Sequence, residues 1–244
     1  MRAVLITGAS RGIGRSTALA FAWKDYDVLV LNSRTDNGSL EELAGELEKI
    51  NSSIRIITSY GNAGDGAYID NLHERLINAG IEVELLINNA AVSYVGLLTD
   101  MTGDDWNETV STNLTSVFNT CHAFVPDMVR AGKGRIINIS SVWGLVGASC
   151  EVAYSATKGA VNAFTKALAK ELAPSGVSVN AAAFGVIDTD MNKNLSEEEK
   201  AVLEEEIPIG RMASPEEAAE LIVKLSEMPA YFTGEVVKFD GGWI

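Results

Sequence analysis

The sequence predicts an α/β fold in which a doubly wound, seven-stranded parallel sheet carries helices on both faces. Three observations indicate this fold. Apolar, β-branched runs alternate with helical-period stretches along the whole chain, several of these runs are continuously apolar, and a glycine-rich turn follows the first of them. Continuous apolar runs such as residues 28–31 are typical of parallel strands, which are buried on both faces.

The expected elements follow one another in a regular order. The strands are expected at residues 3–7, 27–32, 53–58, 84–88, 135–140, 177–183 and 235–240. The helices are expected at residues 13–24, 39–50, 65–79, 102–131, 152–173, 196–206 and 215–226. Ser196 and Ser214 each stand three residues before a glutamate, which is the capping-box spacing that begins a helix.

A glycine-rich turn closes the first expected strand and opens the first helix. Gly8, Gly12 and Gly14 lie in this turn, residues 7–14 (TGASRGIG). Glycines here let the backbone approach a pyrophosphate, whose negative charge the helix N-terminus attracts. The turn therefore predicts one dinucleotide-binding Rossmann domain over residues 1–244. A substrate lid is expected near residues 190–212, because ligands bind where the preceding strand ends. The alternative is that the acidic runs of this segment, residues 197–199 and 204–206, form a solvent-exposed helix face.

The glycine spacing resembles the TGxxxGxG pattern of the short-chain dehydrogenase/reductase family. Further segments similar to family motifs are 88–91 (NNAA), 111–114 (STNL), 137–141 (INISS), 154–158 (YSATK), 179–185 (VNAAAFG), 233–235 (TGE) and 240–242 (DGG). Ala91 and Phe184 depart from the family pattern, which has glycine and proline there. Residues 188–191 (DTDM) and 207–211 (IPIGR) make the chain most similar to the family's 3-oxoacyl-acyl-carrier-protein reductases.

The resemblance implies four catalytic residues, Asn113, Ser141, Tyr154 and Lys158. Tyr154 and Lys158 are four residues apart, so they share a helix face. A free tyrosine has a pKa of about 10, and a nearby ammonium favours the phenolate. We therefore expect Tyr154 to exchange a proton with the substrate oxygen. The resemblance implies that Ser141 orients this oxygen, that Lys158 also holds ribose hydroxyls, and that Asn113 interrupts its helix to hold a water linked to Lys158.

The resemblance also implies a nicotinamide cofactor. The residues implied to bind it are Gly8, Ser10, Arg11, Gly12, Ile13, Gly14, Asn32, Ser33, Arg34, Asn62, Ala63, Asn89, Ala90, Tyr154, Lys158, Gly185, Ile187 and Thr189. NAD-dependent enzymes place a carboxylate at the end of the second strand, where this chain has Asn32. Arg11 and Arg34 can pair with a 2′-phosphate. NADP(H) is therefore expected to be preferred over NAD(H), although Asp36 is close enough in sequence to turn inward.

The expected activity is NADPH-dependent reduction of a 3-oxoacyl thioester or related ketone to a hydroxyl. Two alternatives remain, a dehydrogenase of a sugar, polyol or other small alcohol, and a cofactor-binding sensor without catalysis. Carrier-dependent relatives use basic residues beside the substrate site. This chain has Gly132 and Ser175 at the expected positions, with Arg130 and Lys133 nearby.

Composition narrows the expected partners and compartment. The net charge of −14 disfavours nucleic acids and anionic membrane surfaces. Two cysteines, and no apolar run of membrane-spanning length, indicate a reduced cytoplasmic protein. Cys121 and His122 are adjacent and would point apart on a helix, so no metal site is expected. The resemblance implies a homotetramer, and the expected helix 152–173 supports it because small and apolar residues occupy more than one of its sides.

Overall fold

The strands of the computed structural model, which describes residues 1–193 and 196–244, form one seven-stranded parallel sheet in the order β3-β2-β1-β4-β5-β6-β7. The strands are β1 (Arg2–Ile6), β2 (Val28–Ser33), β3 (Arg55–Tyr60), β4 (Glu82–Asn88), β5 (Gly134–Ser141), β6 (Val177–Phe184) and β7 (Val236–Phe239). The predicted fold class is confirmed. Strand order reverses between β1 and β4, the position at which open α/β sheets bind ligands beyond the carboxyl ends of their strands.

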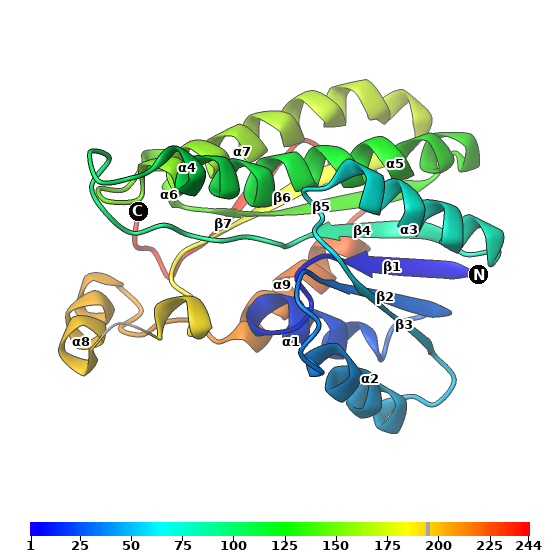
Figure 1. Cartoon of the computed structure of the whole chain (residues 1–244), viewed down its shortest axis with the longest axis horizontal. Helices are drawn as coiled ribbons and strands as arrows, with labels where there is room; N and C mark the ends of the chain where they lie inside the picture. The colour runs from blue at the N-terminus through cyan, green and yellow to red at the C-terminus, as the bar shows by residue number, and fades with distance from the viewer. Residues whose placement is uncertain (194–195) are drawn as a thin grey trace.

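Helices cover both faces of the sheet (Figure 1). In the described residues they are α1 (Gly12–Phe21), α2 (Ser39–Ile50), α3 (Gly66–Asn78), α4 (Gly103–Val110), α5 (Ser116–Ala131), α6 (Trp143–Val146), α7 (Val152–Leu172), α8 (Glu197–Glu206) and α9 (Pro215–Glu227). Three short turns, Ser111–Thr115, Ala173–Ser175 and Asp190–Asn192, complete the helical segments.

Alternate residues of the central strands supply two apolar cores. Val4 and Ile6 of β1 pack in the core formed with α1, α2 and α9. Leu5, between them in sequence, packs in the second core with α3, α5 and α7. Burial on both faces explains why the strands are continuously apolar. Figure 1 shows these two helix layers on opposite sides of the sheet.

The longest predicted helix, residues 102–131, is not continuous. It consists of α4, a π-helical turn at Ser111–Thr115, and α5. Residues 103–110 contain few apolar side chains, so the change of register that the extra residue of a π turn introduces cannot be read from the sequence. Single π turns inside helices are frequent at functional sites.

Several boundaries differ from the expectation by one to three residues, and one short helix was not expected. β3 begins at Arg55 rather than residue 53, because Asn51 holds a turn by accepting hydrogen bonds from the amides of Ser53 and Ile54. The four-residue helix α6 is too short to produce a periodic pattern. The predicted capping boxes are confirmed, with Ser196 bonded to Glu199 and Ser214 to Glu217. No helix in residues 1–193 or 196–244 has the length and apolar character needed to span a bilayer.

Candidate active site

The glycine turn between β1 and α1 has the geometry of a phosphate-binding loop. Gly8 and Gly12 have φ values of 65° and 53°, which favour glycine. A Cβ on Gly14 would lie 2.2 Å from the Gly8 carbonyl oxygen. Arg11, the N-cap residue of α1, forms no side-chain hydrogen bond to the first turn. The first amides of the helix are thus left for another acceptor, and a pyrophosphate fits them.

The carboxyl end of β4 is clamped to this turn. Asn89 Nδ2 donates to the carbonyl oxygens of Thr7 and Gly8, each at 3.0 Å. The Thr7 hydroxyl accepts from the amides of Asn89 and Ala90, also at 3.0 Å. The candidate residues of the first and fourth strands are therefore brought together. Thr7 was not among the predicted site residues, although it begins the glycine segment.

At the carboxyl end of β2, the Asn32 side chain is tied into the protein. Asn32 is buried, and its Nδ2 donates to the carbonyls of Ser59 and Gly61 and to the Tyr68 hydroxyl. Its amide nitrogen is thus satisfied inside the protein. Ser33 lies next along the strand, and its hydroxyl donates to the Thr35 carbonyl at 3.3 Å.

Both arginines expected at the 2′-phosphate are paired with carboxylates. Arg34 lies 2.8 Å from Glu108 of α4. Arg11 lies 3.7 Å from Asp190. These pairs are solvent-exposed and weak, so a phosphate can compete for the guanidinium groups. The Arg11–Asp190 pair also joins the turn that contains Asp190 to the start of α1.

The remaining candidate cofactor residues lie on ordered turns. Asn62 accepts from the Gly64 amide, and the Ala63 carbonyl accepts from Asn119 of α5. A Cβ on Gly12 would lie 3.3 Å from the Thr189 methyl, so these residues are adjacent as expected. Ile187 bridges to Ala213.

The Phe184 ring, which departs from the family pattern, lies in the core. It is buried and packs edge-on against Phe239 with 5.8 Å between ring centroids. Gly185 follows it and packs on Asp240, where a Cβ would lie 2.9 Å from the Asp240 Cα.

Ser141, Tyr154 and Lys158 meet at the carboxyl end of β5. Ser141 is the last residue of that strand, and the other two occupy one face of α7. Their exposed fractions are 6% for Ser141, 9% for Tyr154 and 2% for Lys158. Lys158 Nζ donates to the Ile139 carbonyl at 2.7 Å and lies 5.5 Å from the Tyr154 ring centroid. Ser141 Oγ accepts from the Trp143 amide at 3.2 Å.

Burial shifts the pKa values of both Tyr154 and Lys158. It raises the pKa of Tyr154, the charge of Glu151 raises it further, and Ser141 acts in the opposite direction. Burial also lowers the pKa of Lys158 to about 8. The expected effect of the Lys158 ammonium on the pKa of Tyr154 stays a prediction for the cofactor-bound enzyme. Burial and the charge of Glu151 favour the protonated phenol, which is the proton-donating form.

Asn113 holds a loop rather than contacting Lys158 directly. It lies in the π turn, where its Oδ1 accepts from the Val92 amide and its Nδ2 donates to the Val92 carbonyl, both at 2.8 Å. Nδ2 also lies 3.2 Å from the Thr157 hydroxyl. Asn113 thereby ties the segment after β4 to α7. The expected interruption of the helix at Asn113 is confirmed.

Glu151, which sequence reasoning missed, stands at the N-terminus of α7. It accepts a hydrogen bond from Ser93, so it joins the segment after β4 to the catalytic helix. Its position three residues before Tyr154 was the available signal. Only the structure shows that the intervening turn brings its charge close enough to act on the phenol.

Replacing Glu151 with glutamine should shift the pH profile of the oxidative reaction toward lower pH. The change removes a negative charge that opposes phenolate formation, so the pKa of Tyr154 should fall, while the glutamine oxygen can still accept from Ser93. The pH dependence of kcat/KM for alcohol oxidation measures this shift. Glu48→Gln on α2 removes the same charge far from the site and should leave the profile unchanged. An unshifted profile in Glu151→Gln would contradict the assigned electrostatic role.

The fold and the glycine turn, with Ser141, Tyr154 and Lys158 gathered at the carboxyl end of β5, are those of a nicotinamide-dependent oxidoreductase. The short chain dehydrogenase family matches residues 2–200, and the chain belongs to that family. A nicotinamide cofactor, NAD or NADP, follows from this membership. Among the described residues, no group of three or more His, Cys, Asp and Glu side chains is placed to hold a metal ion.

Relatives and solved structures agree with this assignment over the whole chain. The chain is 39% identical to the 3-oxoacyl-[acyl-carrier-protein] reductase of Aquifex aeolicus, covering 98% of this chain and 95% of the relative. It is 39% identical to the Bacillus subtilis oxidoreductase YmfI, covering 99% and 98%. The crystal structure of 3-oxoacyl-[acyl-carrier protein] reductase from Brucella melitensis superposes with a TM-score of 0.91 at 33% identity, covering 100% and 91%.

A second solved structure has another assigned substrate. It comes from Agrobacterium tumefaciens and is provisionally described as a gluconate dehydrogenase. Its TM-score is 0.93 at 28% identity, and the match covers 99% of this chain and 95% of the other.

Proposed function

We propose that this oxidoreductase uses NADPH to reduce a 3-oxoacyl thioester or a related ketone to the corresponding hydroxyl compound. The observation that carries the proposal is the grouping of Ser141, Tyr154 and Lys158 at the carboxyl end of β5, which places a phenolic proton donor beside a hydroxyl that can bind a carbonyl oxygen. Reduction requires a proton donor beside the carbonyl oxygen, whereas oxidation requires a base. The similarity to 3-oxoacyl-[acyl-carrier-protein] reductases supports the same direction and substrate class.

The proposed mechanism assigns one role to each candidate catalytic residue. A nicotinamide held by the glycine turn and Lys158 would supply the hydride for the carbonyl carbon. The Ser141 hydroxyl orients the carbonyl oxygen by hydrogen bonding, and Tyr154 transfers its proton to that oxygen. Together these transfers convert C=O to CH–OH. Lys158 holds the ribose hydroxyls, and Asn113 fixes the segment after β4 beside α7.

NADPH preference is proposed on the basis of Arg11 and Arg34. Arg11 lies in the glycine turn, and Arg34 follows the carboxyl end of β2. Asn32, at the end of that strand, carries no charge that would repel a 2′-phosphate. Glu108 competes for Arg34. We therefore propose that selection of the phosphate depends on Ser33, Arg34 and Arg11 rather than on the Asn32 side chain.

Replacing Glu108 with glutamine should tighten NADPH binding by about two- to fivefold, which is the size expected for releasing one exposed ion pair. NADH lacks the 2′-phosphate, so its affinity should change little. Calorimetric titration of both cofactors measures the difference, which added salt should reduce. Glu48→Gln is the matched control for overall charge. Equal gains for NADH and NADPH would show that Arg34 does not contact the phosphate.

A strong preference for carrier-bound substrates is not part of this proposal. Arg130 and Lys133, the basic residues near the expected docking positions, are engaged with Asp127 at 2.6 Å and with Glu84 at 2.9 Å. Gly132 and Ser175, at the expected docking positions themselves, are uncharged, and the net charge of −14 repels an acidic carrier. We propose that a carrier-bound 3-oxoacyl group and its small thioester analogue are discriminated only modestly.

The second candidate function is oxidation of a sugar or polyol. The structural similarity to the Agrobacterium protein favours it, with a TM-score of 0.93. A substrate panel separates the two functions. NADPH consumption with 3-oxoacyl thioesters and ketones should exceed NADP reduction with gluconate, sugars and polyols at neutral pH. Turnover confined to the polyols would support the second function and reject the first.

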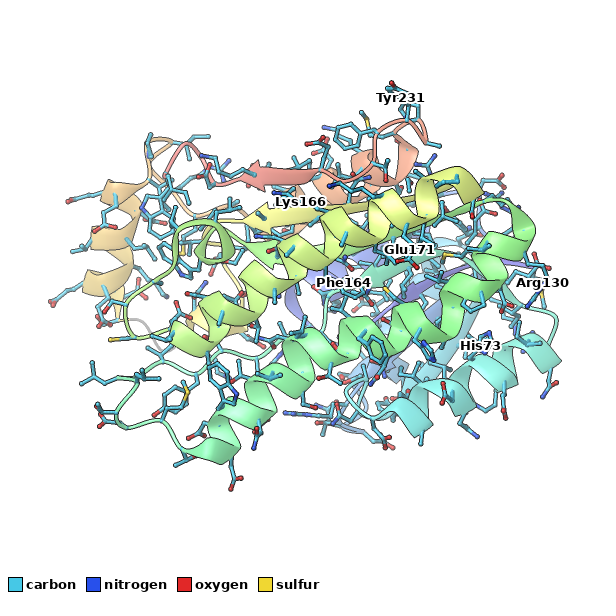
Figure 2. The ribbon with its side chains drawn as sticks, turned by 90° about the horizontal axis from the view of Figure 1, so that it is seen from above. His73, Arg130, Phe164, Lys166, Glu171 and Tyr231 are labelled. Carbon is cyan, nitrogen blue, oxygen red and sulfur yellow. The ribbon has the colours of Figure 1, made fainter. Side chains whose placement is uncertain are left out.

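We also propose a homotetramer working in the reducing cytoplasm. Figure 2 shows α7, α5 and α3 side by side on one outer face, with Phe164 on α7. Phe118 on α5 is 52% exposed and stacks with His122, which supports contact with a second copy through this face. Both cysteines, Cys121 and Cys150, are unpaired thiols.

The lid remains a proposal for the described part of residues 190–212. Asn194 and Leu195, within the expected segment, lie outside the described residues. α8 projects from the catalytic end of the molecule in Figure 1. The segment after it returns to the sheet through Ile207, which is buried. This arrangement supports a cover over the substrate formed by α8 and the residues that follow.

A further inference from the structure

Two tryptophans from distant parts of the chain meet beside the candidate catalytic residues. Trp143 is the first residue of α6, and Trp243 is the penultimate residue of the chain. Their ring centroids are 4.8 Å apart, with an interplanar angle of 58°. Figure 1 shows the C-terminus beside α6 at the carboxyl end of the sheet. The contact therefore places two indoles at the end where Ser141 lies.

Trp143 is fixed to the catalytic group by its backbone. Its amide donates to Ser141 Oγ at 3.2 Å. The next residue, Gly144, packs so closely on α7 that a Cβ would lie 2.6 Å from the Lys158 carbonyl carbon. Asn162 of α7 donates to the Gly144 carbonyl at 3.1 Å. The backbone that carries this indole is thus held in one unit with Ser141 and Lys158.

Trp243 is fixed by the fold of the C-terminal tail. Asp240 accepts from the amides of Gly242 and Ile244, each at 3.0 Å, so the tail forms a closed turn. A Cβ on Gly241 would lie 2.7 Å from Ile209 Cγ2 and 2.9 Å from Ile207 Cγ2. The tail therefore packs between α6 and the segment that follows α8.

Other exposed apolar side chains lie on the two segments that carry this indole pair. Leu145 and Val146 follow Trp143 on α6, and Ile209 lies against Gly241 of the tail. Large apolar side chains left exposed in one region mark a surface that binds an apolar group. Indoles bind such groups well, because they offer a large rigid area with little conformational entropy to lose.

We propose that the Trp143–Trp243 pair is a specificity-determining wall that binds the apolar substituent of the substrate carbonyl, an aliphatic chain or a ring. The inference rests on the proposed carbonyl reduction and narrows its substrate class. A polyol chain against the same wall would lose hydrogen bonds to water without replacing them. The wall therefore selects carbonyl compounds with apolar substituents over sugars.

The test compares Trp243→Ala with Trp23→Ala, which removes a tryptophan that is 74% exposed and follows α1. Substrates are butanone, hexanone, octanone and hydroxyacetone. In the wild-type enzyme kcat/KM should rise with chain length. Trp243→Ala should lower kcat/KM for octanone by about tenfold, the size expected for loss of part of an apolar pocket. Hydroxyacetone should change by less than about twofold, and Trp23→Ala should match the wild-type enzyme.

A binding measurement separates failure of this inference from failure of the proposed function. Octanol binding to the protein saturated with NADPH is titrated by calorimetry in wild type, Trp243→Phe and Trp243→Ala. Affinity should fall in that order, even if none of the ketones is reduced. Circular dichroism confirms that each variant is folded. Two results would reject the proposed role of the tryptophan pair. One is equal octanol affinity in all three proteins, and the other is a wild-type kcat/KM that does not depend on the chain length of the ketones.

Discussion

Replacing Tyr154 with phenylalanine should lower kcat for carbonyl reduction by about 10²–10⁴-fold, the loss typical of removing one general acid. The variant keeps the buried ring beside Lys158 and removes only the hydroxyl that donates the proton. NADPH affinity should therefore remain close to that of wild type. Steady-state rates and calorimetric titration of NADPH measure the two effects separately.

Tyr231→Phe provides the matched control for this change. Tyr231 is 99% exposed and lies near the amino end of β7 (Figure 2). The Tyr231→Phe variant loses the same hydroxyl and should retain wild-type activity. If Tyr154→Phe remained within a few-fold of wild type, the phenol would not be the proton donor. Loss of NADPH binding with loss of activity would instead indicate a role in holding the cofactor.

Replacing Gly14 with alanine should weaken NADPH binding by at least about tenfold and destabilise the fold by about 1–3 kcal/mol, the usual cost of overpacking. The added Cβ would lie 2.2 Å from the Gly8 carbonyl and 2.6 Å from Asn89 Nδ2. Either the turn or the end of β4 must move, and both position the phosphate-binding amides. Chemical denaturation and NADPH titration measure these effects.

Gly45→Ala is the corresponding control in α2. No atom lies within 4 Å of a Cβ added there. This change should stabilise the protein by about 0.5–1 kcal/mol, because alanine has the higher helix propensity. NADPH affinity should stay at the wild-type value. Wild-type binding in Gly14→Ala would mean that the turn does not contact the cofactor.

The sheet and the cofactor turn could be predicted because local sequence determines them. Buried parallel strands require continuous apolar residues, and the positive φ values of Gly8 and Gly12 favour glycine. The spacing of Tyr154 and Lys158 likewise follows from helix geometry. In each case the signal lies within a few residues of the feature that it predicts.

The features that sequence reasoning missed depend on contacts between distant residues. Arg34 meets Glu108 and Trp143 meets Trp243 only because the sheet brings separate crossovers together. The pKa of Tyr154 depends on how deeply the folded protein buries it, which a spacing pattern does not report. Likewise, the Asn32 side chain donates hydrogen bonds to β3 and α3, and the strand pattern alone does not report these partners.

The most direct test of the central claim is transfer of deuterium to a 3-oxoacyl thioester from NADPH that carries deuterium at both positions of nicotinamide C4. The label is followed by mass spectrometry at neutral pH in wild type and Tyr154→Phe. Carbonyl reduction assisted by Tyr154 predicts one deuterium on the hydroxyl-bearing carbon of the wild-type product, and formation of this product slowed by about 10²–10⁴-fold in the variant. Equal rates of labelled product from both proteins, or NADPH consumption without label in the product, would contradict the proposed reaction.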